Sequence, residues 1–228
     1  MTKRTVIVTG GFGALGRVVA AAFAAQGDRV ARVDHAPAAT DATPDGGLDL
    51  GGVDLTDTDA AGHVVTRVVE AWSGVDVLVN VAGGFKWERL GTGQVDTWTR
   101  LYAMNAVTAT TMTKAALPSL LRRPGARIIN IGAKGAVHAD DGMGAYAAAK
   151  SAVHRLTESL AAELAGQDIT VNAVLPSIID TPANRADMPN ADHGTWVSPQ
   201  ELADVILFLA SPASRAITGA LIPVMRGA

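Results

Sequence analysis

Residues 5–16 read TVIVTGGFGALG, and this stretch decides the fold. It opens with a short β-branched run that is typical of a buried strand. Glycines follow, and after them residues 17–26 have the alanine content and length of a helix. Glycine tolerates positive φ and lets a pyrophosphate approach the backbone, while the N-terminus of the helix offers free N–H groups to the phosphates. The stretch therefore predicts a dinucleotide-binding turn made by Gly10, Gly11, Phe12, Gly13, Ala14, Leu15 and Gly16.

Asp34 lies eighteen residues after Gly16, at the end of a second expected strand over residues 29–33. A carboxylate there accepts hydrogen bonds from both hydroxyls of the adenosine ribose and repels a 2′-phosphate. We therefore expect NAD(H) in preference to NADP(H), although His35 weakens that preference slightly and leaves NADP(H) open. Arg32 is expected to point to the opposite face of the strand, which would make it a poor phosphate clamp.

The remainder of the chain alternates short β-branched runs with longer alanine-rich stretches. The expected strands cover residues 5–8, 29–33, 75–79, 127–131, 169–175 and 220–224. The expected helices cover residues 17–26, 60–72, 96–121, 146–165 and 199–210. This alternation predicts an α/β fold, a single Rossmann-type domain over residues 1–228 with a doubly wound parallel sheet and helices on both faces. Residues 36–52 and 180–198 break the rhythm, and the second segment is a candidate lid over the site.

Composition excludes several classes of function. The 228 residues include 19 Lys and Arg against 22 Asp and Glu, a formal net charge of -3, so neither nucleic acid nor a membrane surface is an expected partner. There are no cysteines, which excludes disulfides, thiolate metal sites and cysteine nucleophiles. The five histidines show no metal-ligand spacing, and no metal is expected. No secretory signal or membrane-spanning run is visible, and we expect a cytoplasmic protein.

Tyr146 and Lys150 lie four residues apart in an expected helix and therefore share one of its faces. A tyrosine with its ordinary pKa of about 10 is a poor proton donor or base at neutral pH unless a neighbouring cation favours the phenolate. Lys150, one turn away, supplies that cation. We interpret the pair as a proton-transfer site, with Tyr146 as the proton donor.

With these residues in view, nearly the whole chain resembles the short-chain dehydrogenase/reductase family. Besides the glycine turn and the Tyr146–Lys150 pair, the matching pieces include Asp54-Leu55 and the NVAG sequence at residues 80–83. The resemblance implies that Asp54 contacts the adenine amino group, with the Leu55 backbone beside it. It also implies that the adenosine side of the cofactor is lined by Asn80, Ala82 and Gly83.

The same resemblance assigns the nicotinamide side. It implies that Asn105 holds a water in a proton relay behind Lys150, and that Lys150 also binds the nicotinamide ribose. Pro176 is also implied to contact the cofactor. In the segment that follows it, Ile179 and Thr181 would hold the nicotinamide carboxamide and a nearby phosphate. The long helices imply a homodimer, or a homotetramer that also uses the last strand.

Two residues depart from the family pattern. Ala14 stands where the family has a glycine, but enough glycine remains for cofactor binding. Ala133 stands thirteen residues before Tyr146, where the family carries its catalytic serine, whose hydroxyl would stabilise developing negative charge. Ser151 points elsewhere around the helix and is not an obvious substitute.

A branch of the family that lacks this serine, the dihydropteridine-reductase-like branch, resembles the chain more narrowly. The matching segments are residues 11–16, 81–84, 132–134, 175–176 and 180–185, with a further likeness over 188–196. This implies NADH-dependent reduction of a small conjugated substrate such as quinonoid dihydropterin. Two alternatives stay open: a carbonyl reductase or alcohol dehydrogenase of the wider family, for example of the 3-oxoacyl reductase type, and a non-catalytic NAD-binding module.

Four residues are candidates for contact with the substrate. Phe85 and Trp87 follow the turn at residues 81–84, and their aromatic faces suit a flat heterocycle, although packing under the lid is an equal alternative. Ala133 would face the reacting group in place of the serine. Trp196 would either touch the substrate, anchor the lid or contact a second copy.

Overall fold

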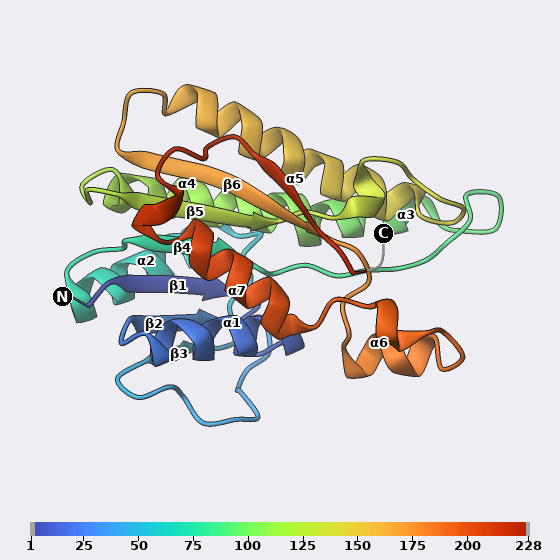
Figure 1. Cartoon of the computed structure of the whole chain (residues 1–228), viewed down its shortest axis with the longest axis horizontal. Helices are drawn as coiled ribbons and strands as arrows, with labels where there is room; N and C mark the ends of the chain where they lie inside the picture. The colour runs from blue at the N-terminus through green and yellow to red at the C-terminus, as the bar shows by residue number, and fades with distance from the viewer. Residues whose placement is uncertain (1–2, 227–228) are drawn as a thin grey trace.

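The computed structural model describes residues 3–226, which form a seven-stranded parallel sheet (Figure 1). The strands lie in the order β3-β2-β1-β4-β5-β6-β7, and every neighbouring pair is parallel. The predicted doubly wound parallel sheet is confirmed. The strands are β1 (Thr5–Thr9), β2 (Arg29–Val33), β3 (Leu48–Leu50), β4 (Val77–Asn80), β5 (Ala126–Ile131), β6 (Ile169–Pro176) and β7 (Leu221–Val224).

Helices cover both faces of this sheet, as Figure 1 shows. One face packs against α1 (Ala14–Ala25) and α7 (Pro199–Leu209). The other packs against α2 (Thr58–Trp72), α4 (Thr108–Leu120) and α5 (Gly144–Glu163). Side chains alternate along each strand, so Val6 and Val8 join the first core and Ile7 joins the second. Because both faces are buried, the strands read as apolar runs, which is why the sequence reveals them.

The winding of the sheet reverses between β1 and β4. β2 and β3 extend the sheet on one side of β1, whereas β4 and the later strands extend it on the other. At such a reversal the loops that follow the two strands diverge, and α/β proteins bind ligands in the crevice beyond the carboxyl ends. The glycine turn after β1 and the loop after β4 flank this place.

The expected helix over residues 96–121 is interrupted. α3 (Val95–Tyr102) gives way to a π-helical turn over Ala103–Val107 before α4 begins. Within this turn Asn105 donates to the Leu101 carbonyl oxygen, and its remaining bonds reach Gly84 on the loop after β4. Turns of this kind often mark functional positions in helices. Hydrophobic periodicity does not reveal them, because the apolar pattern continues on both sides.

Two further differences from the expected elements lie near the amino end. β3 falls inside residues 36–52, a segment expected to be irregular; its three residues are too few to show alternation. It is held to β2 by backbone pairing and by hydrogen bonds from Arg32 to Asp49. α1 begins at Ala14, three residues earlier than expected, because the helix starts directly from the glycine turn.

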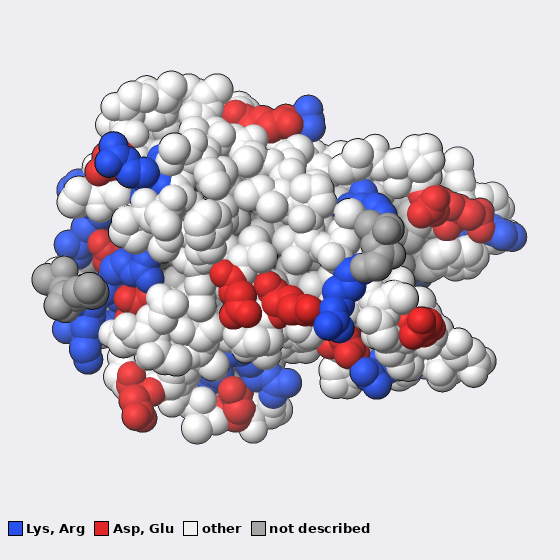
Figure 2. Space-filling view, viewed as in Figure 1, with Lys and Arg blue, Asp and Glu red and all other residues white. Residues whose placement is uncertain are grey.

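Several charged groups near the amino ends of the strands form ion pairs. On the face shown in Figure 2, basic side chains gather at the end of the molecule where β1 begins, with carboxylates among them. Arg4 pairs with Asp28, and Arg123 with Asp76. This face therefore presents no continuous basic tract. No helix within residues 3–226 combines the length and the apolar character needed to cross a bilayer.

Candidate active site

The glycine turn between β1 and α1 is packed too tightly to admit side chains. Gly10 has a φ of +62°, and a Cβ on it would lie 2.9 Å from the Ala82 backbone nitrogen. A Cβ on Gly16 would collide with the Gly10 carbonyl oxygen. α1 begins after Gly13 with no side-chain cap and no acidic residue in its first turn. Its N-terminal N–H groups therefore suit a diphosphate, and the turn fits a dinucleotide.

Thr9, the last residue of β1, fastens this turn to the neighbouring strand. Its Oγ1 accepts the backbone N–H groups of Val81 and Ala82, both at 3.0 Å. The loop after β4 is thereby held beside the glycine turn. No role for the Thr9 side chain is expected from the sequence, where its place directly before the first glycine is the only local signal.

Asp34 stands directly beyond β2, beside the glycine turn. Its Oδ2 accepts the Phe12 N–H at 2.9 Å, and its Oδ1 accepts the Ala36 N–H at 3.0 Å. A carboxylate oxygen has more than one lone pair, so the group can still accept hydrogen bonds from ribose hydroxyls. These bonds also fix its orientation without any cation.

Asp54 and Leu55 follow β3. Asp54 accepts hydrogen bonds from the hydroxyl and the N–H of Thr56 at one oxygen, and these hold its pKa below the usual value. The Leu55 side chain belongs to the core beneath α2 and α4. Only its backbone is left for contact with an adenine ring, which is the contact that the family resemblance implies.

Arg32 does not turn away from this region, and the prediction that it points to the opposite face from Asp34 is wrong. Positions two apart on a strand share a face. The guanidinium lies 5.4 Å from the centroid of the Phe12 ring. It donates two hydrogen bonds to Asp49, at 2.8 and 2.7 Å, and one to Asp41 at 2.8 Å. Each of its three nitrogens is thus committed to a carboxylate.

Asn80 also differs from its predicted role, because its side chain points into the interior. Its amide donates to Thr113 on α4 at 2.9 Å and to Asn130 on β5 at 2.8 Å. Asn130 in turn donates to Thr157 on α5 at 2.9 Å. The Asn80 amide nitrogen therefore braces the sheet against two helices, and the side chain is buried, at 3% exposure, instead of facing a nucleotide. The sequence could not show this, since its partners lie 33 and 50 residues away.

Tyr146 and Lys150 share one face of α5, as predicted, and burial governs both. The Lys150 ammonium is buried and donates to the Ile131 carbonyl oxygen at 2.7 Å. Desolvation lowers the pKa of Lys150 to about 8 and raises the pKa of Tyr146 to about 12. The expected lowering of the tyrosine pKa by the lysine charge is not found, because burial alone shifts the Tyr146 pKa and shifts it upward. Tyr146 therefore holds a proton at neutral pH, but burial makes its phenol a weaker acid than a free tyrosine.

Gly83 marks the point where Asn105 and Lys150 approach each other. A Cβ on Gly83 would lie 3.4 Å from Lys150 Nζ, and 2.5 Å from Asn105 Oδ1. The Asn105 amide donates to Leu101 and to the Gly84 carbonyl, and its oxygen accepts the Gly84 N–H at 3.2 Å. The side chain thus anchors the loop after β4. Its part in a proton relay stays a prediction.

Phe85 and Trp87 lie on that same loop, and each is about half exposed. The Phe85 ring meets the Tyr146 ring edge-on, with centroids 5.0 Å apart. Trp87 instead donates its ring N–H to the Asp141 carbonyl at 2.8 Å, and Arg89 lies over its ring at 5.6 Å. The structure therefore brings Phe85 to the tyrosine and ties Trp87 to the turn before α5.

The segment after β6 lies beyond the carboxyl ends of the strands (Figure 1). Pro176 ends β6, and Ile179 forms a bridge with Val197 that closes the segment at its base. The hydroxyl of Thr181 accepts the Asn184 N–H at 3.2 Å and so caps α6 (Pro182–Asp187). The candidate lid therefore contains the short helix α6 and a single 3-10 turn over His193–Thr195, and the Ile179–Val197 bridge joins its two ends.

Trp196 belongs to the base of this segment. It is 4% exposed, and its ring lies against His193 with centroids 4.3 Å apart. Of the three roles considered for it, the structure supports anchoring the segment. Direct contact with a substrate is not compatible with its burial.

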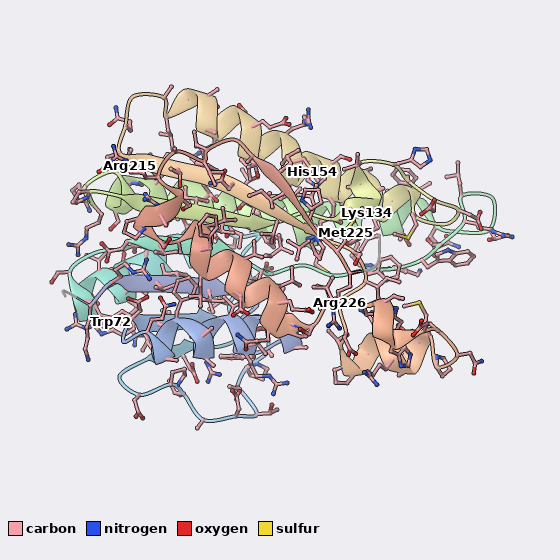
Figure 3. The ribbon with its side chains drawn as sticks, in the orientation of Figure 1. Trp72, Lys134, His154, Arg215, Met225 and Arg226 are labelled. Carbon is pink, nitrogen blue, oxygen red and sulfur yellow. The ribbon has the colours of Figure 1, made fainter. Side chains whose placement is uncertain are left out.

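Ala133 follows β5 and is 4% exposed. Its N–H donates to Nε2 of His154 at 3.3 Å, and His154 lies on α5, two turns beyond Tyr146 (Figure 3). The His154 nitrogen acts here as an acceptor. The Ser151 hydroxyl, which the sequence does not favour as a substitute for the serine, donates to the Ala136 carbonyl at 2.9 Å. Both polar side chains are thus engaged with the backbone of the turn after β5.

Comparison with known proteins agrees with this geometry. A family model described as enoyl-(acyl carrier protein) reductase matches residues 12–228. The chain belongs to the short-chain dehydrogenase/reductase family. It is accordingly an oxidoreductase, of a family that uses NAD(P)(H).

Individual members of the family show how far the likeness extends. The 3-oxoacyl-[acyl-carrier-protein] reductase of Thermotoga maritima is 29% identical to this chain, over 98% of it and 97% of its own length. The meso-2,3-butanediol dehydrogenase of Serratia marcescens is 32% identical, over 99% and 94% respectively. The structure of the Thermoplasma acidophilum aldohexose dehydrogenase superposes with a TM-score of 0.87, at 26% identity, covering 97% of this chain and 92% of that one.

The protein should lose stability in acid, because the buried His154 accepts the Ala133 N–H in its neutral form. Burial is the main cause that lowers the pKa of His154 from 6.5 to about 4. The unfolded chain therefore takes up a proton as the pH falls through 6.5, whereas the folded chain does so only near 4. The stability that this difference provides is fully present above pH 6.5 and is lost towards pH 4, by up to about 3 kcal/mol.

Urea unfolding at about pH 7 and about pH 4.5 measures this loss. The variant His154→Gln keeps an acceptor for the Ala133 N–H but has no proton to gain. Its free energy of unfolding should therefore fall less than that of the wild type over the same interval. Carboxylates titrate equally in both proteins, so an identical fall in the two would show that His154 is not the group responsible.

Proposed function

We propose that the protein is an NADH-dependent reductase of a small conjugated imine, with quinonoid dihydropterin as the substrate. The observation that carries the proposal is Ala133. Tyr146 and Lys150 are present on α5, while the position of the serine hydroxyl is taken by a buried methyl group. The site thus keeps its proton donor but lacks the group that would stabilise charge on a carbonyl oxygen.

The chemistry of a quinonoid pterin suits that combination. The molecule is an electron-poor conjugated imine, and a hydride added to it places charge on nitrogen within a delocalised ring. A ketone would instead develop charge on one oxygen. Loss of a single donor to such an oxyanion costs about 3 kcal/mol in the transition state. A substrate that spreads the charge tolerates Ala133 better than a ketone does.

Tyr146 would deliver the proton that completes the reduction. Its pKa of about 12 keeps the phenol protonated at neutral pH, and the Phe85 ring at 5.0 Å holds it from one side. Phe85 is half exposed, so its outer face can stack on a flat ring. Lys150, with a pKa of about 8, is mostly charged at neutral pH and would bind the nicotinamide ribose.

The residues present fit NADH, which supplies the hydride when it is bound. The first turn of α1 would hold the diphosphate, and Asp34 would accept the ribose hydroxyls. Asp34 carries two oxygens that would repel a 2′-phosphate, which supports NADH over NADPH. Ile179 and Thr181 would hold the carboxamide and a nearby phosphate.

Sequence likeness to the dihydropteridine-reductase-like branch supports the same substrate. It lies in the turn after β5, which contains Ala133, and in the segment over residues 180–196. Both lie at the carboxyl ends of strands, where substrate specificity resides in this type of sheet. Residues 1–228 would act as one dinucleotide-binding unit in the cytoplasm.

A carbonyl reductase is the second candidate. The relatives that favour it are named for 3-oxoacyl, butanediol and hydroxybutyrate chemistry. This reading requires a water or another donor to replace the hydroxyl missing at Ala133. A non-catalytic NAD-binding role is less well supported, since it gives no reason for Tyr146 and Lys150.

A homo-oligomer is part of the proposal. Between α3 and α5 an open, mostly apolar groove of about 420 Å³ is lined by Trp98 and Tyr102 on one side and by alanines of α5 on the other. Large exposed apolar side chains over small ones allow close helix packing between copies. A homodimer through these helices, or a homotetramer that adds β7, would cover them.

The experiment that tests the proposal is NADH oxidation by the purified protein with freshly generated quinonoid dihydropterin, alongside a panel of ketones and aldehydes. We expect fast turnover on the pterin and little on the carbonyls, and a lower kcat/KM with NADPH than with NADH. Turnover on carbonyls alone would favour the second candidate. A preference for NADPH would contradict the role given to Asp34.

The variant Tyr146→Phe tests the proton donor. Removing the hydroxyl should lower kcat on the pterin by about a hundredfold or more, because general acid catalysis contributes at least that factor. The KM for NADH should change little, since the phenol is not assigned to cofactor binding. Unchanged turnover would show that the proton comes from elsewhere.

The variant Ala133→Ser tests the meaning of the missing hydroxyl. It should raise kcat/KM for ketones by about tenfold or more while changing pterin reduction far less. Ala162→Ser, on an exposed turn near the end of α5, is the matched control and should alter neither activity. An equal gain on both substrate classes would mean that Ala133 does not discriminate between them.

A further inference from the structure

A buried cation lies next to the proposed adenosine site. Arg32 is 1% exposed, and its guanidinium nitrogens donate to the carboxylates of Asp49 and Asp41. The Phe12 ring covers it at 5.4 Å. Asp49 is itself fixed, because it accepts the Thr43 hydroxyl at 2.6 Å. The guanidinium is therefore held from three directions by side chains of the glycine turn, β3 and the loop after β2.

This cluster adjoins the glycine turn directly. Gly11 rests on Arg32, so closely that a Cβ on the glycine would lie 2.6 Å from the arginine Cβ. The next residue, Phe12, donates its N–H to Asp34 while its ring covers the guanidinium. Phe12 therefore contacts both Arg32 and Asp34, the carboxylate proposed to accept the ribose hydroxyls.

The charge balance of the cluster opposes a phosphate at this place. Arginine is the side chain whose geometry best matches a phosphate, through its planar fork of donors. Here the fork is occupied by Asp49 and Asp41, which carry two negative charges against one positive charge. Asp34 adds a third carboxylate. A 2′-phosphate would meet net negative charge and an arginine with its nitrogens already engaged.

We propose that Asp41 and Asp49 are specificity-determining residues that keep Arg32 from binding the 2′-phosphate of NADP(H). Preference for NAD(H) then has two successive causes, repulsion by Asp34 and sequestration of Arg32. The inference rests on the proposed binding of a dinucleotide and concerns its adenosine end alone. It implies that removing Asp34 is not sufficient to admit NADPH, since Arg32 stays bound to its carboxylates.

Binding of NADH and NADPH without substrate, measured by calorimetry, tests this proposal. D34S alone should tighten the Kd for NADPH by less than about tenfold. D34S/D41N/D49N should tighten it by a further tenfold or about that, because the released guanidinium makes charged hydrogen bonds to the phosphate. This second gain should shrink as salt is added. Adding R32Q to the triple variant should abolish this second gain. That result would also show that the phosphate binds Arg32 and not Arg17, an arginine bonded to Thr40.

The matched control is Asp28→Asn, which removes the same charge from the Arg4–Asp28 pair at the opposite end of β2. It should leave both affinities unchanged. Circular dichroism establishes that each variant is folded. Where D34S/D41N/D49N fails to fold, D34S/D41N alters a carboxylate that is already 40% exposed and should show a smaller gain in the same direction.

Two results would overturn the proposal: full NADPH affinity in D34S alone, or an undiminished affinity after R32Q is added to the triple variant. Failure of the wild type to bind either dinucleotide would overturn it together with the proposed function. Selective binding of NADH without pterin turnover, in contrast, would support this inference and remove only the proposed substrate.

Discussion

The close packing of the glycine turn against its neighbours is the constraint on which the rest of the structure depends. Gly10 meets the backbone of Ala82, Gly11 meets Arg32, and Gly16 meets Gly10 itself. At each contact a Cβ would have no room. Because these glycines have no side chains, the ends of β1, β2 and β4 can lie close together. The Thr9 hydroxyl then links the end of β1 to the loop after β4. The positions proposed for the diphosphate, ribose and nicotinamide all lie along that shared edge.

Local patterns in the sequence predict the parts of this protein whose causes are local. The strand, turn and helix over residues 5–25 follow from composition and period, and the meeting of Tyr146 with Lys150 follows from helical spacing. The face of Arg32 follows from the period of two along β2, which the prediction misapplied, but the partners of Arg32 and Asn80 could not be found in this way. Their partners come from other strands and helices, so a charged or amide side chain on a buried strand reads as exposed until the fold is known.

One row of side chains on α5 shows how a single physical cause has three different effects. Tyr146, Lys150 and His154 follow one another at intervals of four residues. Burial acts on each by disfavouring the charged form. The tyrosine retains its proton, and the lysine is still mostly charged at neutral pH because its pKa of about 8 lies above 7. The histidine is neutral and accepts the Ala133 N–H. The spacing in the sequence indicates these three residues, but their protonation states depend on how deeply the fold buries each side chain.

The central place of β1 has a consequence for the order in which the chain matures on the ribosome. β1 finds β2 soon after it is made, but its other partner, β4, starts only at Val77. Until then one edge of β1 stays open and the Thr9 hydroxyl has no backbone to hold. Pairings between strands so far apart in sequence form slowly. Docking of β4 is therefore the step that covers the second edge of β1 and brings the Thr9 hydroxyl to its backbone partners, so a chain that stops before Val77 leaves that apolar edge unpaired.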